Sequence, residues 1–444
     1  MDRQLKSILG LVILAALGFV CGVLVYSGLS SGSIPENTWV GPLYLGGRTR
    51  SEAIELLEWL DGSIRQREVL LDVQGHVYRV QSQDLNVRIN MEEAKRLVDE
   101  FVGSHNLISR VLDSVRSAEL DIHRPLPMEY DRDAMDLLCE QLAAAIDRPA
   151  INARYDITSQ MFIPETLGIA VDRAELVSAL LSGFQQSGPV IVALPLKAVE
   201  PDVTLSLLDR LGISTCISSY QTAFNLNDAP RSSNIRLAAE LIDSTILLPQ
   251  QEFSFNDRVG PRTREAGFLE AKEIVDNEYV IGIGGGVCQV SSTLYNAALL
   301  AQCEIIERRP HSRISSYIPA GRDATVYYPV IDLRFLNTLD RPIMISAQVE
   351  KNVLYTAVLS NSAERRRVEI VTRTAATLKP SVQRVEDASL PAGTEVVDQE
   401  AEDGFVIETY RRVYANDGKL LSEELLSRDT YLPVNRVIRV GTRM

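Results

Sequence analysis

A glycine-rich turn that runs directly into a helical pattern constrains the middle of this chain more than any other feature. The stretch GIGGGVCQVSSTLYNAALLA covers residues 282–301. Gly284, Gly285 and Gly286 can adopt backbone angles that a Cβ forbids, so they suit a tight turn that brings bare amides near a ligand. After the turn, apolar residues recur at helical spacing, which predicts a helix with one buried face. Cys288 falls in the first turn of this helix.

This position favours a reactive cysteine, because unpaired amides and the positive end of the helix dipole stabilise a thiolate. Cys288, Ser292 and Tyr295 fall on one helical face, so we expect Ser292, Tyr295 and Gln289 to form a binding site with the three glycines. The alternative is a small buried cysteine, since free cysteine packs like a small hydrophobe. The turn does not match a nucleotide site, because it has neither the Lys-Ser or Lys-Thr of a P-loop nor GxGxxG spacing.

Length and charge restrict the classes of partner. A chain of 444 residues has room for about three or four domains. Apolar residues at 45% and charged residues at 23% are ordinary for globular protein. The net charge of -14, from 59 carboxylates against 45 Lys and Arg, argues against nucleic acid as a main partner.

The N-terminal segment carries an uncharged run of 22 residues, Ile8 to Leu29. A helix of this length covers a bilayer core of ~30 Å. Arg3 and Lys6 precede the run, and the positive-inside rule then places the short N-terminus in the cytoplasm. We therefore predict a single-pass signal anchor in the cell membrane, with the bulk of the chain extracytoplasmic. A cleaved signal peptide is the competing interpretation.

The cysteines after this run are Cys139, Cys216, Cys288 and Cys303. Four cysteines in an exported chain allow three disulfide pairings. A bridge between Cys288 and Cys303 is disfavoured, because a helix of ~14 residues between them separates their Cα atoms too far. The scattered histidines His76, His105 and His123 form no pair at metal-ligand spacing, so we expect neither a metal site nor a cofactor.

Two segments before the glycine turn repeat the same order of a hairpin, a six-residue strand and a helix. The first comprises residues 69–80, LNVRIN at 85–90 and 91–101; the second comprises residues 151–163, LGIAVD at 167–172 and 173–184. We interpret them as a duplicated α+β module, with an additional helix at 135–146. Neither copy carries a catalytic cluster, which favours a binding or spacer role.

The strands predicted after the central helix carry His311 and Asp323, which complete the residue types of a thiol triad. In such a triad an imidazole exchanges a proton with the thiol, and a carboxylate fixes the tautomer of the imidazole. We predict Cys288 as nucleophile, His311 as proton carrier and Asp323 as the residue that orients His311. Glu307 is a weaker third member, and Gln289 could donate an amide hydrogen bond to an oxyanion. Structural roles for His311 and Asp323 are the alternative.

Six segments together resemble the VanW family, which is named for an accessory protein of glycopeptide-resistance clusters. They are RSSNIRLAAELI at 231–242, FSFNDRVGPRT at 253–263, GGGVCQVSSTLYNA at 284–297, IIERRPHS at 305–312, YIPAGRDATV at 317–326 and DLRFLN at 332–337. The duplicated units are similar to peptidoglycan-binding modules that often precede a VanW domain. The resemblance implies a bacterial cell-envelope protein whose partner is peptidoglycan or another cell-wall polymer.

The C-terminal residues 385–442 alternate β-rich runs with turns, including Asp403-Gly404 and Asp417-Gly418. Asp-Gly pairs favour hairpins. This segment resembles the G5 module of wall-associated exported proteins, which implies an elongated β domain. A plain β spacer is the alternative.

The predicted fold class is therefore α+β and multidomain. The expected parts are a cytoplasmic tail and transmembrane helix at 1–30, two peptidoglycan-binding modules at 31–115 and 116–200, a VanW domain at 201–362 and a G5-like β domain at 363–444. The order of glycine turn, cysteine helix, histidine strand and aspartate strand is similar to the layout of transglutaminases and papain.

These observations favour a membrane-anchored extracytoplasmic thiol enzyme, a hydrolase or transpeptidase that acts on peptidoglycan peptides. The alternative from another class is a non-catalytic peptidoglycan-binding scaffold or accessory protein of the envelope. A third possibility is a redox-sensitive or structural cysteine. The sequence leaves open which bond is attacked.

Overall fold

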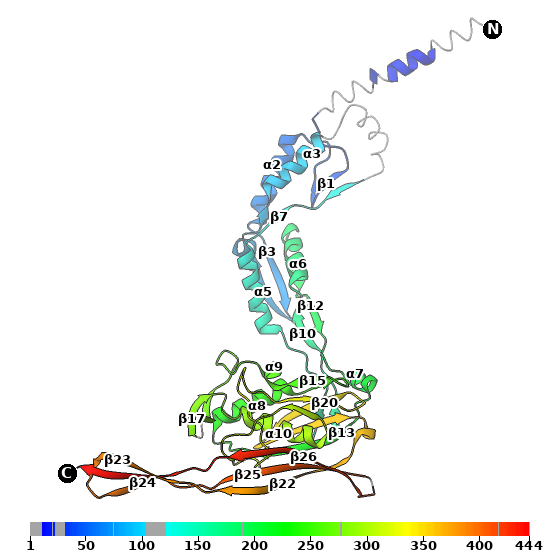
Figure 1. The fold of residues 1–444 in the computed structure, drawn as a ribbon. Helices are drawn as coiled ribbons and strands as arrows, with labels where there is room; N and C mark the ends of the chain where they lie inside the picture. Colours follow the sequence, from blue (N-terminus) through cyan, green and yellow to red (C-terminus); the bar gives the residue numbers. More distant parts are fainter. Residues whose placement is uncertain are drawn as a thin grey trace. The chain divides into compact units, whose positions relative to one another are not determined.

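The computed structural model of this chain describes residues 11–19, 21–22, 32–73, 75–103, 121–188, 190–275, 278–415 and 417–443. The chain divides into two compact units (Figure 1). The first unit comprises Met1–Pro149 with Leu167–Glu200, and the second comprises Ala150–Thr166 with Pro201–Met444. Residues 150–166, which we assigned to the second repeat, are thus part of the second unit.

The predicted fold class included a membrane-spanning helix over Ile8–Leu29, and this part of the prediction is wrong. Residues 11–19 and 21–22 of this run are helical and exposed, and the remainder of the run lies outside the described residues. Within the described ranges, no helix is both long enough and apolar enough to cross a membrane, which takes about 20 consecutive apolar residues. The fold class is therefore corrected to mixed α+β with many small sheets.

The first unit consists of amphipathic helices packed on short sheets. Its helices are α2 (Arg50–Ile64), α3 (Met91–Gly103), α5 (Arg132–Ile146) and α6 (Arg173–Gln185). Its strands are β1 (Thr38–Val40), β2 (Leu43–Tyr44), β3 (Glu68–Val73), β4 (His76–Gln81), β5 (Arg88–Ile89), β6 (Ile122–Arg124), β7 (Met128–Glu129), β10 (Gly168–Val171), β11 (Val190–Ala193) and β12 (Leu196–Val199). They form the sheets β2-β1-β6, β11-β3-β4, β5-β7 and β10-β12.

The first repeat and the strand and helix of the second repeat share a single hydrophobic core in this unit. Strand β11, which follows the second repeat, pairs in parallel with β3 of the first repeat, with Val190 opposite Val69. Leu71 of the first repeat and Leu180 and Phe184 of the second are fully buried in the same cluster. The repeats therefore stabilise each other, because each covers apolar surface that the other exposes.

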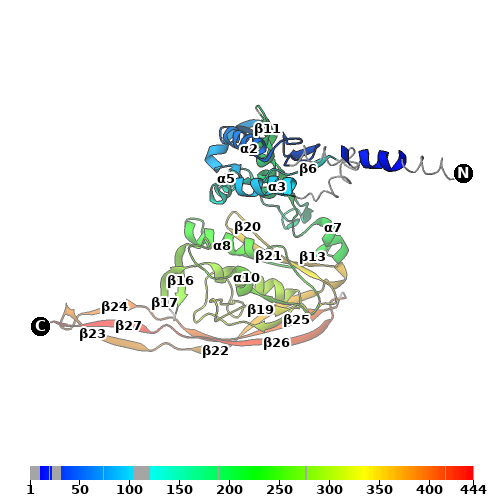
Figure 2. The ribbon, with the colours of Figure 1, turned by 90° about the horizontal axis from the view of Figure 1, so that it is seen from above.

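The second unit is built on an antiparallel four-stranded sheet. Its order is β13-β21-β20-β14, from β13 (Thr215–Ala223), β14 (Thr245–Leu247), β20 (Ile343–Glu350) and β21 (Val353–Ser360). Helices α8 (Ala229–Ile242) and α10 (Val287–Leu300) pack against this sheet and against each other (Figure 2). The remaining short elements are β8 (Arg154–Asp156), β9 (Met161–Ile163), α7 (Leu205–Leu211), β15 (Glu252–Ser254), α9 (Phe255–Val259), β16 (Glu270–Val275), β17 (Glu278–Ile283), β18 (Glu304–Glu307) and β19 (Arg334–Leu336).

Helix α10 is the central helix of this unit and is covered on nearly all sides. Of its fourteen residues, only Cys288 and Leu300 are not buried. Val290 and Leu294 pack into the same core as Ile235 of α8 and Val358 of β21. A helix embedded in this way has little freedom to shift, so the turn that precedes it is held in one place.

Long β strands form the C-terminal part of the second unit, and they extend as two narrow, consecutive sheets (Figures 1 and 2). One sheet has the order β22-β25-β26, from β22 (Arg367–Leu378), β25 (Gly404–Tyr414) and β26 (Leu420–Tyr431). The other has the order β23-β27-β24, from β23 (Val382–Pro391), β24 (Glu395–Gln399) and β27 (Arg436–Arg443). The turn at Asp417-Gly418, where Gly418 has φ 85°, lies between β25 and β26 and confirms that predicted hairpin.

The close packing of the glycine turn gives a prediction about stability. A Cβ added at Gly285 would lie 2.6 Å from the Lys272 carbonyl oxygen and 2.9 Å from Ala271, and backbone atoms cannot move aside at low cost. We expect Gly285→Ala to lower the free energy of unfolding of the second unit by about 1–3 kcal/mol. Calorimetric unfolding of the full chain measures this effect.

Gly62 provides the matched control, because it lies on the exposed face of α2 with no atom near the position of a Cβ. Gly62→Ala should leave stability unchanged or raise it by about 0.5–1 kcal/mol, since alanine loses less backbone entropy in a helix. An equally stable Gly285→Ala variant would contradict the packing described for the turn.

Candidate active site

The glycine turn that precedes α10 is fixed by both backbone conformation and a buried amide. Gly284 and Gly286 have φ of 96° and 109°, in the region that side chains rarely adopt. Asn234 of α8 is fully buried; its Nδ2 donates to the carbonyls of Leu269 and Gly285, and its Oδ1 accepts from the Leu269 N–H. The turn is therefore held on α8 and aims the start of α10 in a fixed direction.

Cys288 is the second residue of α10 and is half-buried. Its Sγ lies 3.5 Å from the Val326 carbonyl oxygen. The N–H groups of Val287 and Gln289 donate to the carbonyls of Gly284 and Gly286, whereas the N–H of Cys288 makes no hydrogen bond with a described residue. A free amide at a helix N-terminus can donate to an anion.

His311 and Asp323 form a buried pair beside this thiol. His311 Nδ1 lies 2.6 Å from Asp323 Oδ2, and the backbone N–H of His311 donates to the same oxygen over 2.6 Å. His311 is 6% exposed and Asp323 is 1% exposed. The carboxylate accepts the hydrogen bond from Nδ1, so Nε2 is the ring nitrogen available to the Cys288 thiol, which lines the same cleft as His311.

The pKa values of the thiol and the imidazole move in opposite directions. Burial raises the pKa of Cys288, but the hydrogen bond and charge of His311, with a smaller effect of Arg262, lower it below the ordinary thiol value. Burial lowers the pKa of His311, whereas the hydrogen bonds and charges of Asp323 and Cys288 raise it to about 9. These directions favour a thiolate paired with an imidazolium at neutral pH.

Asp323 is held by residues that the sequence did not indicate. Its Oδ1 accepts from Arg308 Nη2 at 3.0 Å and from the Tyr431 hydroxyl at 2.5 Å. Arg308 also pairs with Asp429 through Nη1 at 2.5 Å. Burial raises the pKa of Asp323, but the hydrogen bond of His311 and the charges of His311 and Arg308 lower it overall. Strand β26, which carries Asp429 and Tyr431, thus contributes directly to this network.

A cleft of about 960 Å³ opens over Cys288 and His311. The predicted glycines Gly284, Gly285 and Gly286 line it. Its other walls carry cations and aromatic rings, namely Arg231, Arg262, Lys272, Tyr317, Tyr327 and Tyr328. The candidate nucleophile therefore faces a space large enough for a peptide segment.

Gln289 lines the cleft, but its side chain has no donor left for an oxyanion. Its Nε2 donates to the Thr222 hydroxyl at 3.0 Å and to the Ala223 carbonyl at 2.9 Å, while its Oε1 accepts from Arg231. The predicted oxyanion role of this side chain is therefore corrected, because both amide protons are used in the fold. The Cys288 N–H, by contrast, has no partner among the described residues.

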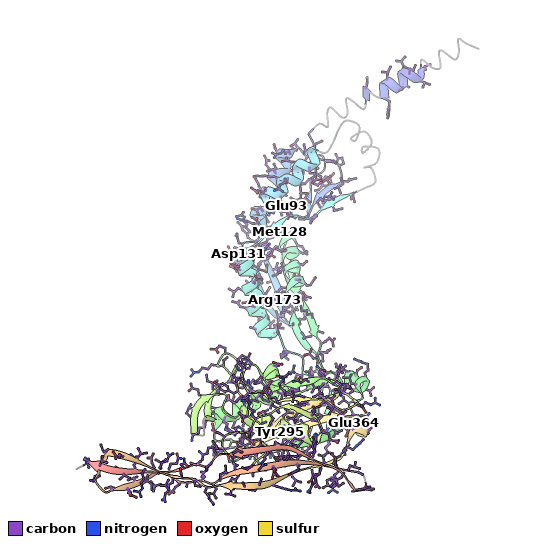
Figure 3. The ribbon with its side chains drawn as sticks, in the orientation of Figure 1. Glu93, Met128, Asp131, Arg173, Tyr295 and Glu364 are labelled. Atoms are coloured by element: carbon purple, nitrogen blue, oxygen red, sulfur yellow. The ribbon has the colours of Figure 1, made fainter. Side chains whose placement is uncertain are left out.

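Ser292 and Tyr295 are also corrected, because neither lines the cleft. The Ser292 hydroxyl donates to the Cys288 carbonyl at 2.7 Å and accepts from the Ala324 N–H at 2.9 Å, so it joins α10 to the segment after Asp323. Tyr295, labelled in Figure 3, is 2% exposed and packs under the Arg308 guanidinium at 5.3 Å from its centroid. Both residues support the site from within the core.

The remaining candidate residues are placed away from this chemistry. Glu307 accepts from the Asp332 N–H at 3.2 Å, so it is not the partner of His311. The five cysteines, all described, are free, and burial raises the pKa of the Cys303 thiol to about 12. In the part of the chain that the structure describes, no group of three or more His, Cys, Asp or Glu is placed to hold a metal ion.

Three family models match separate parts of the chain. The model described as "VanW like protein" matches residues 230–359, which include Cys288, His311 and Asp323. The model described as "G5 domain" matches residues 368–443. The model described as "Putative peptidoglycan binding domain" matches residues 78–191. The matched segments correspond to the three kinds of domain that the sequence motifs resemble.

Individual proteins are also similar to this chain. The uncharacterized protein YoaR of Bacillus subtilis (strain 168) is 36% identical over 230 residues, which is 51% of this chain and 75% of that protein. The vancomycin B-type resistance protein VanW of Enterococcus faecalis (strain ATCC 700802 / V583) is 28% identical over 112 residues, covering 24% of this chain and 41% of that protein. The solved structure of an IgA1 protease G5 domain matches with 26% identity and a TM-score of 0.13, covering 18% of this chain and 95% of that one.

The pairing of His311 with Asp323 predicts a shifted imidazole titration. We expect His311 to titrate near pH 9 in the native protein, because Asp323 and the thiolate stabilise the imidazolium. Asp323→Asn removes the carboxylate while burial remains, so the pKa of His311 should fall below its native value, with Cys288 alone still raising it. NMR of protein with labelled histidine measures this titration, since the chain has 4 histidines.

Glu307→Gln is the matched control, because it removes a neighbouring carboxylate that is bonded to a backbone amide instead of His311. Its His311 titration should remain near the native value. An ordinary titration of His311 in the native protein, or equal shifts in the two variants, would contradict the described pair.

Proposed function

Because this chain belongs to the VanW family and is a cell-wall-associated protein, we propose that it is a thiol-dependent hydrolase or transpeptidase acting on peptidoglycan peptides. The observation that carries the proposal is that Cys288 and His311 line the same open cleft, where His311 is bonded to Asp323 and His311 and Cys288 shift each other's pKa. Buried groups whose pKa values shift toward a charged pair are expected where a thiol acts as a nucleophile.

The proposed reaction uses the groups in sequence. The Cys288 thiolate attacks an amide carbonyl, forming a C–S bond and an oxyanion that the Cys288 N–H and the start of α10 stabilise. The His311 imidazolium then gives its proton to the leaving amine as the C–N bond breaks, which leaves a thioester. Water or an acceptor amine attacks the thioester, His311 removes the proton of this nucleophile, and the thiolate is released. Hydrolysis and transpeptidation differ only in the acceptor.

The other domains fit a role in placing the site on the wall. The peptidoglycan binding domain over residues 78–191 supports binding of a cell-wall polymer. We propose that it holds the wall while the cleft in the second unit acts on a peptide. This function requires an extracytoplasmic location, because the polymer lies outside the cytoplasm.

A non-catalytic wall-binding scaffold is the second candidate. The buried network of Arg308, Asp323, Asp429 and Tyr431 favours it, because these contacts join strand β26 to the family region whether or not Cys288 reacts. In a scaffold this network would serve docking alone, and the cleft would be a recognition surface. Substitution of the thiol separates the two functions.

We expect Cys288→Ser to abolish peptide turnover and retain wall binding. Incubation of the protein with purified bacterial sacculi, with released peptides and new amines counted by mass spectrometry, measures turnover. Loss of the nucleophile should reduce the rate at least about a thousandfold. Sedimentation with the same sacculi should be unchanged, because the serine alters one atom within the cleft.

Cys216→Ser is the matched control, since this half-buried cysteine lies on β13 and donates to the Ser218 carbonyl outside the cleft. It should retain both turnover and binding. Native turnover that survives in Cys288→Ser, or sacculi that are bound but never altered by the native protein, would overturn the enzyme in favour of the scaffold.

A further inference from the structure

The guanidinium of Arg262 lines the cleft; hydrogen bonds hold one of its terminal nitrogens, and the other has no hydrogen-bond partner in the part of the chain that the structure describes. Its Nη1 donates to Asn256 Oδ1 at 2.8 Å and to the Gly260 carbonyl at 2.9 Å. The same group lies over the rings of Phe255 and Tyr328, at 5.6 Å and 6.0 Å from their centroids. Its Nη2 is buried and has no hydrogen-bond partner among the described residues.

The nearby acidic side chain does not satisfy this cation. Asp332 acts on Arg262 through its charge, but its oxygens accept from the Ser254 hydroxyl and the N–H groups of Asn256 and Leu333. A buried donor without a partner is uncommon in proteins and calls for an explanation. The position of Arg262 in the wall of the cleft provides one, because a bound anion would accept from Nη2.

The charged residues around the cleft also favour binding of an anion. Arg231, Arg262 and Lys272 line it, and Asp228 is the acidic residue among its lining side chains. Asp228 already accepts from the Arg231 N–H at the start of α8. The cleft is therefore positive in a chain whose net charge is -14, and the N-terminus of α10 adds to this field.

A second unused donor also lines the cleft. Thr325 Oγ1 is buried without a hydrogen-bond partner among the described residues, and Thr325 precedes Val326, whose carbonyl contacts the Cys288 thiol. An arginine and a hydroxyl beside a nucleophile suit an anionic group that is part of the substrate. Arginine suits carboxylates, because its planar guanidinium can donate two parallel hydrogen bonds to the two carboxylate oxygens and carries the opposite charge.

We propose that the cleft recognises its peptide through a free carboxylate near the bond that Cys288 attacks, and that Arg262 binds this carboxylate. The inference rests on the proposed function and adds the substrate class to it: acidic peptides, or peptides with a free C-terminus, in preference to their amides. Arg262 is thus a specificity-determining residue, and its role is separate from proton transfer by His311.

Two alkylating reagents of nearly equal size test this selectivity on the full chain. Iodoacetate and iodoacetamide both form a C–S bond with the thiolate and release iodide, but only iodoacetate carries a carboxylate. The ratio of their rate constants at Cys288 should exceed the same ratio for free glutathione by at least about tenfold, as expected for a hydrogen bond to a charged group. Arg262→Gln should return the ratio to the glutathione value.

Arg264→Gln is the matched control, because Arg264 lies two residues from Arg262 and carries the same charge. Its side chain is exposed and pairs with Glu270 outside the cleft. The variant should keep the native ratio. A native ratio equal to that of glutathione, or an equal loss in both variants, would overturn the inference. A Cys288 inert to both reagents would instead overturn the proposed function, so the two failures are distinguishable.

Protection of the native protein tests the inference without relying on a variant that folds. Acetate should slow alkylation by iodoacetamide more than acetamide does at the same concentration and ionic strength. Two peptides separate the possible sources of the carboxylate: N-acetyl-alanyl-alanine has a free C-terminus, and N-acetyl-glutamyl-alanine amide has only a side-chain carboxylate. Protection by either one supports the inference and names the source, whereas equal protection by neutral amides overturns it.

Discussion

The buried carboxylate of Asp323 is the constraint on which the rest of the site depends. A charge that is 1% exposed costs several kcal/mol unless it is paired and hydrogen-bonded. Its partners are His311, Arg308 and Tyr431, and each connects the carboxylate to a different part of the structure. His311 links it to the thiol, Arg308 links it to Asp429, and the tyrosine brings in strand β26. The carboxylate thus joins the candidate active site to the docking of the C-terminal strands.

The other half of the site depends on packing. Helix α10 is covered on nearly all sides, and the buried amide of Asn234 ties the glycine turn to α8. Cys288 can therefore be half-exposed while its neighbours are not. The cleft in front of it is lined by cations, and Arg262 is held by Asn256 and Gly260 with one nitrogen unused. A rigidly held thiol and a fixed cation in the same cleft would suit the proposed selection among peptides.

The sequence predicted those parts of the site that depend on local chemistry. The glycine turn, the helix that begins near Cys288 and the candidates His311 and Asp323 follow from residue types and spacing, and the structure places them together. Ser292 and Tyr295 lie in the core and not in the cleft, because helical periodicity defines faces without showing that the core covers all of them. Tyr431 and Arg262 carry no local signal, since the tyrosine meets a carboxylate 108 residues away. The apolar run at Ile8–Leu29 predicted a membrane span from its hydropathy, whereas no helix within the described residues is long and apolar enough to be one.

The pH dependence of the alkylation of Cys288 by iodoacetamide, in the native protein and in His311→Ala, tests the central claim most directly. A thiolate stabilised by His311 stays ionised below the ordinary thiol pKa of about 8.5, so the native rate should remain high at neutral pH and fall only at lower pH. His311→Ala should raise the inflection toward the ordinary value or above it, because burial is then opposed only by the smaller effects of Val326 and Arg262. A single inflection near 8.5 that is the same in both proteins would contradict the Cys288–His311 pair and leave the wall-binding scaffold as the better account.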